Sequence, residues 1–382
     1  MEEKFVCPKC QNSDPRYIGY DINNKPYCRK CISFSGRMVV SPNIINKGIE
    51  LNLAYPLSPK QKEISNQVIS SYLKNKPVLI NAVTGAGKTE LVYGVMELAL
   101  KQGRQVGFAI PRKDVVIDLA PRIHSAFPKA KLAVVYGNHS DVIQGDIVLL
   151  TTHQLYRYTN YFDLLIVDEI DAFPFKGNET LYTFLKKALK GVLVMMSATP
   201  DNKTISSFEK NGTVLYLNER YHHHKLPVPT YVKFLPIKLL SLISEMRKIL
   251  KENKPLFVFV PTIQIGLKLS PLIKKIFPNG EFVSSESEER EKIIEDFKRG
   301  KYLYLITTSI LERGVTLKNL QVIVYQADHD LFTAEGLIQI VGRVGRKADA
   351  YDGKCIFIGE RKNESISRAI ETIERINAKA RL

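Results

Sequence analysis

A glycine-rich loop constrains the fold of this 382-residue chain more than any other feature of its sequence. The run AVTGAGKTE at 82–90 follows the apolar run 78–80 and opens a helical stretch from Thr89. A loop between a strand and a helix can point backbone N–H groups at phosphate oxygens. The strict pattern begins with glycine, whereas this chain has Ala82. We predict a phosphate-binding loop in an α/β domain, the alternative being a glycine-rich turn without a ligand.

The residues of this loop have separate roles in a nucleotide site. Lys88 is expected to reach the β and γ phosphates, and the hydroxyl of Thr89 to hold Mg²⁺. ATP and Mg²⁺ are therefore predicted cofactors. The predicted nucleotide contacts in the loop are Thr84, Gly85, Ala86, Gly87, Lys88, Thr89 and Glu90.

Carboxylates follow the apolar run YFDLLIV at 161–167. Open α/β sheets place ligands at the carboxyl ends of their strands, which is where Asp168 and Glu169 fall. We predict that Asp168 binds Mg²⁺ and that Glu169 polarises the attacking water as a general base. An acidic turn without a catalytic role is common by itself. Its position after a glycine-lysine loop favours the catalytic interpretation.

Two further runs carry groups that could sense the nucleotide. Ser197 and Thr199 follow the apolar run 193–196 and could connect the metal site to a second domain through their hydroxyls. In QIVGRVGR at 339–346, Gln339, Arg343 and Arg346 are expected at the start of a helix, on one face. If a second domain closes over the first, the two arginines would stabilise charge on the transferring phosphoryl group. The alternative is surface arginines on a glycine-bearing loop.

Four of the five cysteines lie near the N-terminus in the pattern C-x2-C-x17-C-x2-C. We predict that Cys7, Cys10, Cys28 and Cys31 hold a structural zinc ion in a tetrahedral site. Disulfides or a redox pair are the alternatives, which a reducing cytosol disfavours. Because the module is small, we expect it to fold only when its metal ion is bound. Cys355, in the run KCIFIG, is expected to be a small core residue.

The chain is strongly basic, with a formal net charge of +16. An excess of this size suits a polyanionic partner such as nucleic acid or an anionic membrane surface, although a merely basic soluble protein remains an alternative. The cysteine module interleaves basic and aromatic residues, as a single-stranded nucleic acid would require. The alternative is a solvated surface with tyrosines packed on the metal cluster. These residues are Arg16, Tyr17, Tyr20, Lys25, Tyr27, Arg29, Lys30, Phe34 and Arg37.

Strand-like and helical runs alternate in two series, which predicts two parallel sheets covered on both faces. After a loose linker at 36–56, a helix should begin with Ser58 as its N-cap. The run NERYHHHKLPVPTYVKF at 218–234 marks a boundary, and its three histidines are expected in a solvated or phosphate-touching loop rather than at a metal. No apolar run approaches a membrane span, and the acidic first residues do not suit a secretory signal, so we expect a cytosolic protein. The predicted segments are 1–40, a zinc module, 41–57, a linker, 58–225, the first domain, and 226–382, the second.

The order of these runs resembles that of the superfamily 2 helicases. By that resemblance, AVTGAGKTE, AIPRKDVV, TTHQL, DEID, SAT, FVFVPT, TTSILERGVT and QIVGRVGR are the successive helicase motifs. The resemblance implies two RecA-like domains in tandem. It also implies that Gln61 reads the adenine edge and that Gly314 contacts the nucleotide. Two departures, Ile340 and Thr316, remove a cationic contact in one motif and alter the end of another.

In helicases of this class a nucleic-acid strand lies across both domains and is held by its backbone. The resemblance places these phosphate contacts at Arg112, Thr152, Thr262 and Thr308. Backbone contacts carry little base information, so binding should tolerate any sequence. ATP-driven closure and reopening of the domains would then move the strand in one direction.

The cysteine module directly before the motor, together with DEIDAFPF, TTHQLYRY and TTSILERGVT, resembles the ComFA family of late competence proteins. That resemblance implies a cytoplasmic ATPase dependent on single-stranded DNA, peripheral at the inner face of the cell membrane and acting in DNA uptake with ComFC and DprA. A primosomal-type repair helicase, an RNA helicase and a DNA-binding scaffold switched by ATP are the alternatives.

Overall fold

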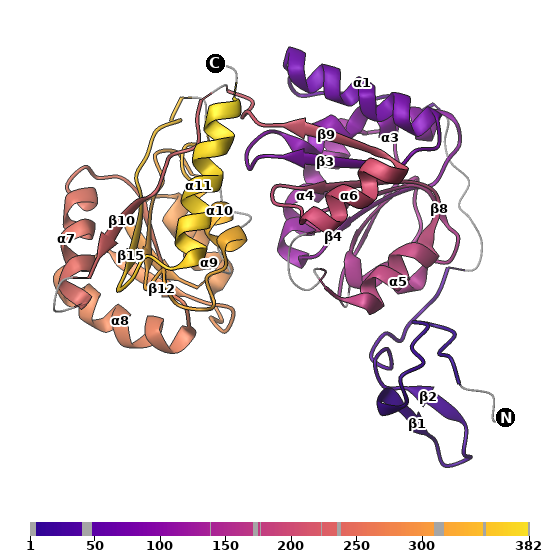
Figure 1. The fold of residues 1–382 in the computed structure, drawn as a ribbon, viewed down its shortest axis with the longest axis horizontal. Coiled ribbons are helices and arrows are strands. Elements are labelled where there is room, and N and C mark those ends of the chain that lie inside the picture. Colours follow the sequence, from indigo (N-terminus) through magenta and orange to yellow (C-terminus); the bar gives the residue numbers. More distant parts are fainter. Residues whose placement is uncertain are drawn as a thin grey trace. The chain divides into compact units, whose positions relative to one another are not determined.

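In a computed structural model of this protein, the chain forms two compact units. The first unit comprises 1–82 and 87–217, and the second 83–86 and 218–382. Each unit is built on its own sheet with flanking helices (Figure 1). The structure describes residues 5–39, 48–137, 139–170, 175, 177–222, 224–234, 238–308, 317–346 and 349–380.

The first unit contains a seven-stranded parallel sheet with strand order β5-β6-β4-β7-β8-β3-β9. Every residue of β4 and β6 is buried, because helices cover both faces of a parallel sheet and its central strands can be apolar throughout. The strands are β3 (Val78–Ala82), β4 (Val106–Ile110), β5 (Leu132–Val135), β6 (Ile147–Thr151), β7 (Phe162–Asp168), β8 (Leu189–Ser197) and β9 (Thr213–Leu217).

The helices of the first unit begin where the sequence supplies caps. Ser58 and Gln61 form a reciprocal capping box at the start of α1, as the predicted N-cap requires. Asn178 caps α5 from one side only, since its side chain accepts from Leu181 N. The helices are α1 (Pro59–Leu73), α2 (Lys88–Leu91), α3 (Tyr93–Lys101), α4 (Lys113–Ala126), α5 (Glu179–Ala188), α6 (Asn202–Asn211) and the 3-10 helix η2 (Thr152–Arg157).

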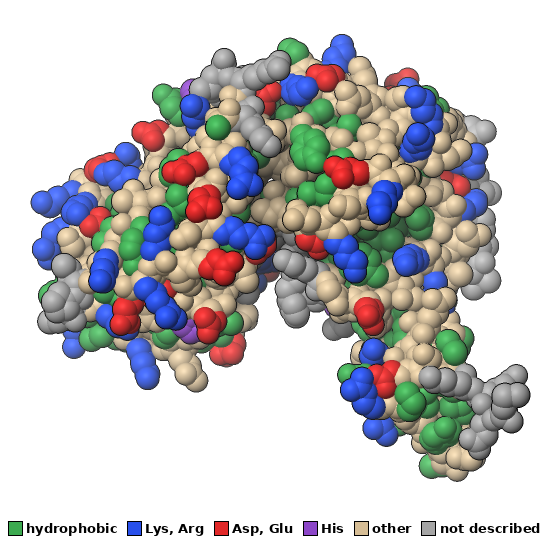
Figure 2. Space-filling model, viewed as in Figure 1, with side chains coloured by type: hydrophobic (Ala, Val, Ile, Leu, Met, Phe, Trp, Pro, Cys, Tyr) green, Lys and Arg blue, Asp and Glu red, His purple; other side chains and the backbone are tan. Residues whose placement is uncertain are grey.

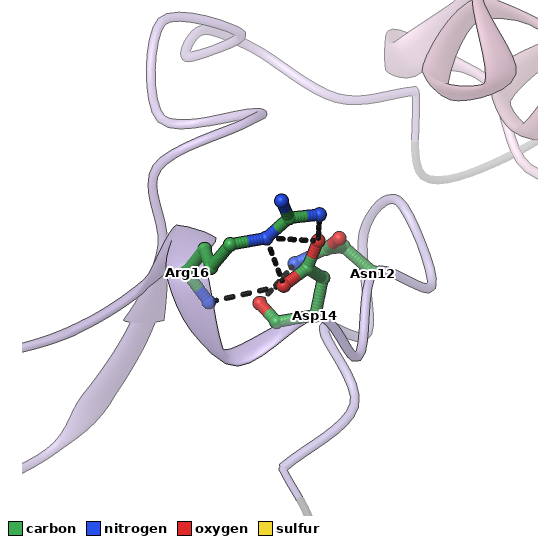
Figure 3. Close-up of polar contacts among 3 residues, drawn as sticks. All are labelled: Asn12, Asp14 and Arg16. Atoms are coloured by element: carbon green, nitrogen blue, oxygen red, sulfur yellow. Dashed lines mark hydrogen bonds and ion pairs between the residues drawn. The ribbon is translucent and has the colours of Figure 1, made fainter.

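The cysteine module, residues 5–39, belongs to the first unit. It contains the 3-10 helix η1 (Pro15–Tyr17) and an antiparallel pair of short strands, β1 (Ile18–Tyr20) and β2 (Pro26–Cys28). Asp14 caps η1, and Figure 3 shows its carboxylate held by the Arg16 guanidinium, with Nη2 at 2.7 Å. These hydrogen bonds lower the pKa of Asp14 to about 2. Arg16 therefore has an intramolecular partner in the module.

The second unit contains a six-stranded parallel sheet with strand order β10-β15-β14-β11-β13-β12. Its strands are β10 (Thr230–Lys233), β11 (Leu256–Phe259), β12 (Gly280–Val283), β13 (Tyr304–Thr307), β14 (Gln321–Tyr325) and β15 (Cys355–Gly359). Its helices are α7 (Lys238–Leu250), α8 (Ile263–Ile276), α9 (Arg290–Lys298), α10 (Ala334–Val341) and α11 (Glu364–Lys379). Cys355 is buried in β15, as predicted.

The two RecA-like parallel sheets confirm the predicted α/β class, with local differences. Strands β9 and β10 were not predicted, because β9 is a short run between polar segments and β10 directly follows two prolines, Pro227 and Pro229. The units meet in the sequence between Leu217 and Asn218, before the predicted boundary at 225. In the predicted linker, the residues after 47 contact the first unit, since Ile49 is fully buried and Asn52 N donates to Ala126 O. Over the part of the chain that the structure describes, no helix has the length and apolarity needed to cross a bilayer.

Candidate functional site

The glycine-rich loop lies between β3 and α2, as predicted. Gly85 and Gly87 have φ values of 81° and 74°, a left-handed conformation that favours glycine. A Cβ on Gly87 would also lie 2.6 Å from Gln61 Nε2. The loop therefore needs glycine at this position for two reasons, backbone conformation and the close approach of Gln61. Two left-handed glycines between a strand and a helix suit a phosphate-binding loop, and the individual contacts of residues 84–90 remain predictions.

The strand register brings several predicted site residues to one edge of the first sheet. Asp168, the last residue of β7, is in register with Met196 of β8. The next residue of β8, Ser197, is in register with Asn81 of β3, directly before the glycine-rich loop. The order β7-β8-β3 thus places a carboxylate, a hydroxyl and the loop at adjacent carboxyl ends of strands.

Two features hold the backbone at this edge. Glu169 has a φ of 59°, which is uncommon for a residue with a side chain, and its N–H donates to Asp168 Oδ1 at 2.8 Å. Ser197 is fully buried, and its Oγ accepts from Thr199 N at 3.0 Å. Asp171 of the acidic run lies outside the described residues.

Two predicted nucleotide contacts also take part in local structure. Gln61 Oε1 accepts from Ser58 N at 2.9 Å, so its carbonyl helps to begin α1. Glu90 pairs with Arg122 at 2.6 Å. The amide nitrogen of Gln61 lies beside Gly87 of the loop. The contact of Gln61 with the edge of adenine remains a prediction.

The predicted nucleic-acid contacts of the first unit follow two neighbouring strands. Ile110 of β4 pairs with Thr151 of β6, and Arg112 and Thr152 come shortly after them. Arg112 pairs with Asp114 at 2.7 Å. Thr152 is fully buried, and its hydroxyl has no hydrogen-bond partner among the described residues. A phosphate contact through that hydroxyl would require it to become exposed, and both contacts remain predictions.

The second unit repeats this relationship. Phe259 of β11 pairs with Thr307 of β13, and Thr262 and Thr308 follow these strands. Thr262 caps α8, because its Oγ1 accepts from Ile265 N at 3.2 Å. Within each unit, the predicted phosphate-binding residues therefore follow the carboxyl ends of two neighbouring strands.

The predicted placement of QIVGRVGR was wrong in one respect. Gln339 lies near the end of α10, rather than at the start of a helix, and Arg343 and Arg346 lie in the turn that follows. Arg343 is 2% exposed, and Arg346 Nε donates to Gly342 O at 2.9 Å. Glycine at 342 ends the helical run earlier than the spacing of the arginines suggested. Gly314 and Thr316, in the other motif with a departure, lie outside the described residues.

The four cysteines of the module converge, as their spacing predicted. Their sulfur atoms all lie within 4.8 Å of one another, with Cys7 to Cys31 and Cys10 to Cys28 each at 3.5 Å. A tetrahedral zinc ion with bonds of about 2.3 Å separates its sulfur ligands by about 3.8 Å, so the cluster fits zinc. Burial raises the pKa of the Cys10 thiol to about 11, and a bound cation would oppose that effect.

The module is anchored to η2, which carries the run TTHQLYRY. Tyr156 OH donates to Ser35 O at 2.6 Å, and Arg157 Nη1 donates to Arg37 O at 2.8 Å. Arg157 is buried, and its backbone O accepts from Val39 N at 2.9 Å. This anchoring role of Tyr156 and Arg157 was not predicted, because their partners Ser35 and Arg37 lie more than a hundred residues earlier in the sequence.

Several basic and aromatic side chains of the module remain at its surface, whereas one does not. Tyr17 and Tyr20 are exposed, and Lys30 Nζ lies 4.6 Å from the Tyr17 ring centroid. Figure 2 shows hydrophobic and basic side chains gathered on the same face of the module. Phe34 is partly buried and packs on α5, with its ring 5.0 Å from that of Phe184, so it has a structural role beside its predicted nucleic-acid contact.

The histidines of the predicted boundary loop are packed rather than solvated. His222 Nε2 donates to Gly345 O at 3.0 Å, and the His224 ring stacks on Tyr351 at 3.5 Å. His223 lies outside the described residues. Within the described ranges, the four cysteines are the one cluster of three or more His, Cys, Asp or Glu side chains whose ligand atoms lie close enough together to hold a metal ion.

Comparison with known proteins supplies the family. Two family models match, "Type III restriction enzyme, res subunit" over residues 54–202 and "Helicase conserved C-terminal domain" over 238–348. "Competence protein ComFA" of Bacillus subtilis is 34% identical over 98% of this chain and 86% of its own. The protein of the same name from Streptococcus pneumoniae is 37% identical over 99% and 92%. The chain belongs to the ComFA family.

This member of the ComFA family thus combines a four-cysteine module with the two sheets of a superfamily 2 helicase. A solved structure, "S. cerevisiae Dbp5 bound to RNA and ADP BeF3", matches with a TM-score of 0.62 at 16% identity, covering 85% of this chain and 93% of that one. At that identity the likeness shows the fold alone. The two family models identify the chain as an ATP-hydrolysing enzyme of the helicase type.

Proposed function

We propose that this protein is an ATP-dependent translocase for single-stranded DNA that drives or assists DNA uptake in natural transformation. Membership of the ComFA family is the observation that carries the biological role. The chemical role rests on the shared edge of Asp168, Ser197 and the glycine-rich loop in the first sheet.

In this proposal the glycine-rich loop and Lys88 bind the triphosphate, while Thr89 and Asp168 hold Mg²⁺. The metal ion neutralises charge on the phosphates when it is bound. Glu169 accepts a proton from the attacking water, and its backbone N–H keeps the neighbouring Asp168 carboxylate oriented. Arg343 and Arg346 stabilise the developing negative charge.

The proposed nucleic-acid path uses loops in both units. Arg112 and Thr152 would hold the strand on the first unit, and Thr262 and Thr308 would hold it on the second. Each pair follows neighbouring strands, so each unit offers one grip on the backbone. The net charge of +16 supports a polyanionic partner.

The cysteine module is proposed to bind zinc and to extend this path. Its anchoring to η2 places it directly beside the residues that follow Thr152. Tyr17 and Tyr20 are exposed rings on which bases could stack, and Lys30 lies beside one of them. We further propose a cytoplasmic location, peripheral to the membrane, and the partners ComFC and DprA, on the family resemblance alone.

The deciding experiment compares ATP hydrolysis by the purified protein with single-stranded DNA, duplex DNA and RNA. The proposal expects the strongest stimulation by single-stranded DNA, independent of its sequence. Equal stimulation by RNA would refute the DNA assignment, and stimulation by duplex DNA alone would refute the preference for single strands. The rate should fall steeply with added salt, because phosphate contacts release counterions.

A further inference from the structure

A short segment that precedes β10 donates hydrogen bonds to the turn that carries Arg343 and Arg346. Arg220 is 1% exposed and donates from Nη1 to Val344 O at 2.8 Å and to Gly345 O at 2.6 Å. These bonds fix the carbonyl groups directly between the two candidate catalytic arginines. A buried guanidinium that reaches two neighbouring carbonyls determines both their position and their orientation.

The next two residues of the segment continue this contact. Tyr221 OH donates to Arg346 O at 3.0 Å, and His222 Nε2 donates to Gly345 O at 3.0 Å. His222 Nδ1 accepts from His224 N, so the ring is neutral with its proton on Nε2. Three consecutive side chains therefore donate to the backbone of one turn.

The turn itself has little freedom to adjust. Gly345 has a φ of 65°, and a Cβ there would lie 2.0 Å from Tyr351 O. Arg343 is almost fully buried and cannot easily adopt another rotamer. A displaced backbone would therefore displace the arginine side chains as well.

Among the residues that the structure describes, all three acceptors that the Arg220 guanidinium reaches are carbonyl oxygens, and none is a carboxylate. Burial, and after it the charge of Arg346, lowers the pKa of Arg220 to about 9, which still leaves the guanidinium protonated near neutral pH. Burying a cation without a counter-charge is costly, and an apolar side chain would fill the same space at lower cost. The arrangement indicates a positional role rather than a gain in stability.

We propose that Arg220, assisted by Tyr221 and His222, is a positioning residue for Arg343 and Arg346. The inference rests on the proposed function, in which those two arginines stabilise the transferring phosphoryl group. The guanidinium hydrogen bonds of Arg220 go to the backbone of the turn, and its side chain also passes beside Gly85 of the glycine-rich loop. Arg220 acts by fixing the backbone from which the arginine side chains extend.

The test measures kcat and KM for ATP, with saturating single-stranded DNA, in Arg220→Ala, Arg346→Ala and the double variant. For Arg220→Ala we expect kcat to fall about 100-fold, while KM for ATP changes less than about twofold. The double variant should be no slower than Arg346→Ala alone by more than about twofold, because both changes remove one function. The matched control is Arg299→Ala, an exposed arginine paired with Glu295, and should retain wild-type rates.

Rescue separates positioning from general damage. Low concentrations of guanidinium ion should restore part of the activity of Arg220→Ala, because the ion can occupy the space of the lost group. The ion should not restore Lys88→Ala. Wild-type kcat in Arg220→Ala, losses that multiply in the double variant, or absence of rescue would each overturn the proposal.

A second variant covers the case in which Arg220→Ala does not fold. Tyr221 is partly exposed, so Tyr221→Phe removes only the hydroxyl and should fold. We expect kcat to fall about fivefold, equivalent to one hydrogen bond, with KM unchanged. A wild-type kcat would count against the proposal. A wild-type protein that hydrolyses no ATP would instead refute the proposed function.

Discussion

Phe34 of the cysteine module meets Phe184 of α5 edge to face, with ring centroids 5.0 Å apart. Phe34 also stacks on His153 of η2 at 6.0 Å and contacts the Tyr156 ring at 5.7 Å. One side chain of the module thus contacts both α5 and η2. Because η2 follows β6 directly, the module is tied to a predicted nucleic-acid loop rather than to an arbitrary surface.

Replacement of Phe34 by alanine should loosen the module without removing its metal site. Loss of a partly buried aromatic ring that packs on other rings should cost about 2 kcal/mol. The expected result is faster proteolytic cleavage between the module and α1, with unchanged metal content. Tyr20→Ala is the matched control, since Tyr20 is 62% exposed and should not affect cleavage. Cleavage of Phe34→Ala at the wild-type rate would contradict this account of the anchoring.

Metal analysis tests the cysteine cluster directly. Protein purified under reducing conditions without chelator should contain a single zinc ion per chain, and Cys28→Ser should lose it, because a structural site needs all four ligands. Cys355→Ala is the control and should keep its zinc, since Cys355 lies in β15, away from the cluster in the sequence and in the other unit. Metal-free wild-type protein, or zinc retained by Cys28→Ser, would refute the site.

The sheets could be predicted because their central strands are nearly continuous apolar runs. The predicted runs 106–110 and 132–135 coincide with β4 and β5. The site residues at the ends of β3 and β7 could be predicted in the same way, because they directly follow apolar runs. The cysteine cluster could also be predicted, since ligand spacing alone specifies a tetrahedral site. In these cases local sequence carries most of the structural information.

Other features depended on contacts between residues far apart in the sequence. Nothing near Arg220 indicates that its guanidinium would be buried against the turn after α10, more than a hundred residues later. The same holds for Arg157, whose partner Arg37 lies in the cysteine module. The end of α10 was misplaced because the spacing of arginines suggests a helix, whereas Gly342 and Gly345 favour a turn.

Replacement of Lys88 by alanine distinguishes a motor from a scaffold that only responds to ATP. Loss of the charge that reaches the phosphates should reduce ATP hydrolysis by at least about 100-fold. Binding of single-stranded DNA in the absence of nucleotide should remain near the wild-type level, because the predicted DNA contacts lie on other loops. Transformation of cells carrying Lys88→Ala provides the biological measurement. Full transformation without ATP hydrolysis would refute the motor hypothesis.

The pH dependence of stability should report the packing of His222. Burial, together with the nearby charge of Arg220, lowers the pKa of His222 below its ordinary value of 6.5. As the pH falls below 6.5, the unfolded chain therefore binds a proton more readily than the folded protein, and the free energy of unfolding decreases. Protonation would also remove the acceptor at Nδ1 that His224 N uses.

His222→Gln should make this decrease shallower, because glutamine can still donate to Gly345 O but does not titrate. The measurement is chemical denaturation of wild type and variant at several pH values on either side of 6.5, monitored for the second unit. Above 6.5 the difference in free energy of unfolding between the two proteins should be constant, which serves as the internal control. Equal slopes below 6.5 would show that His222 takes up its proton as readily in the folded protein as in the unfolded chain, contrary to its packing against the turn.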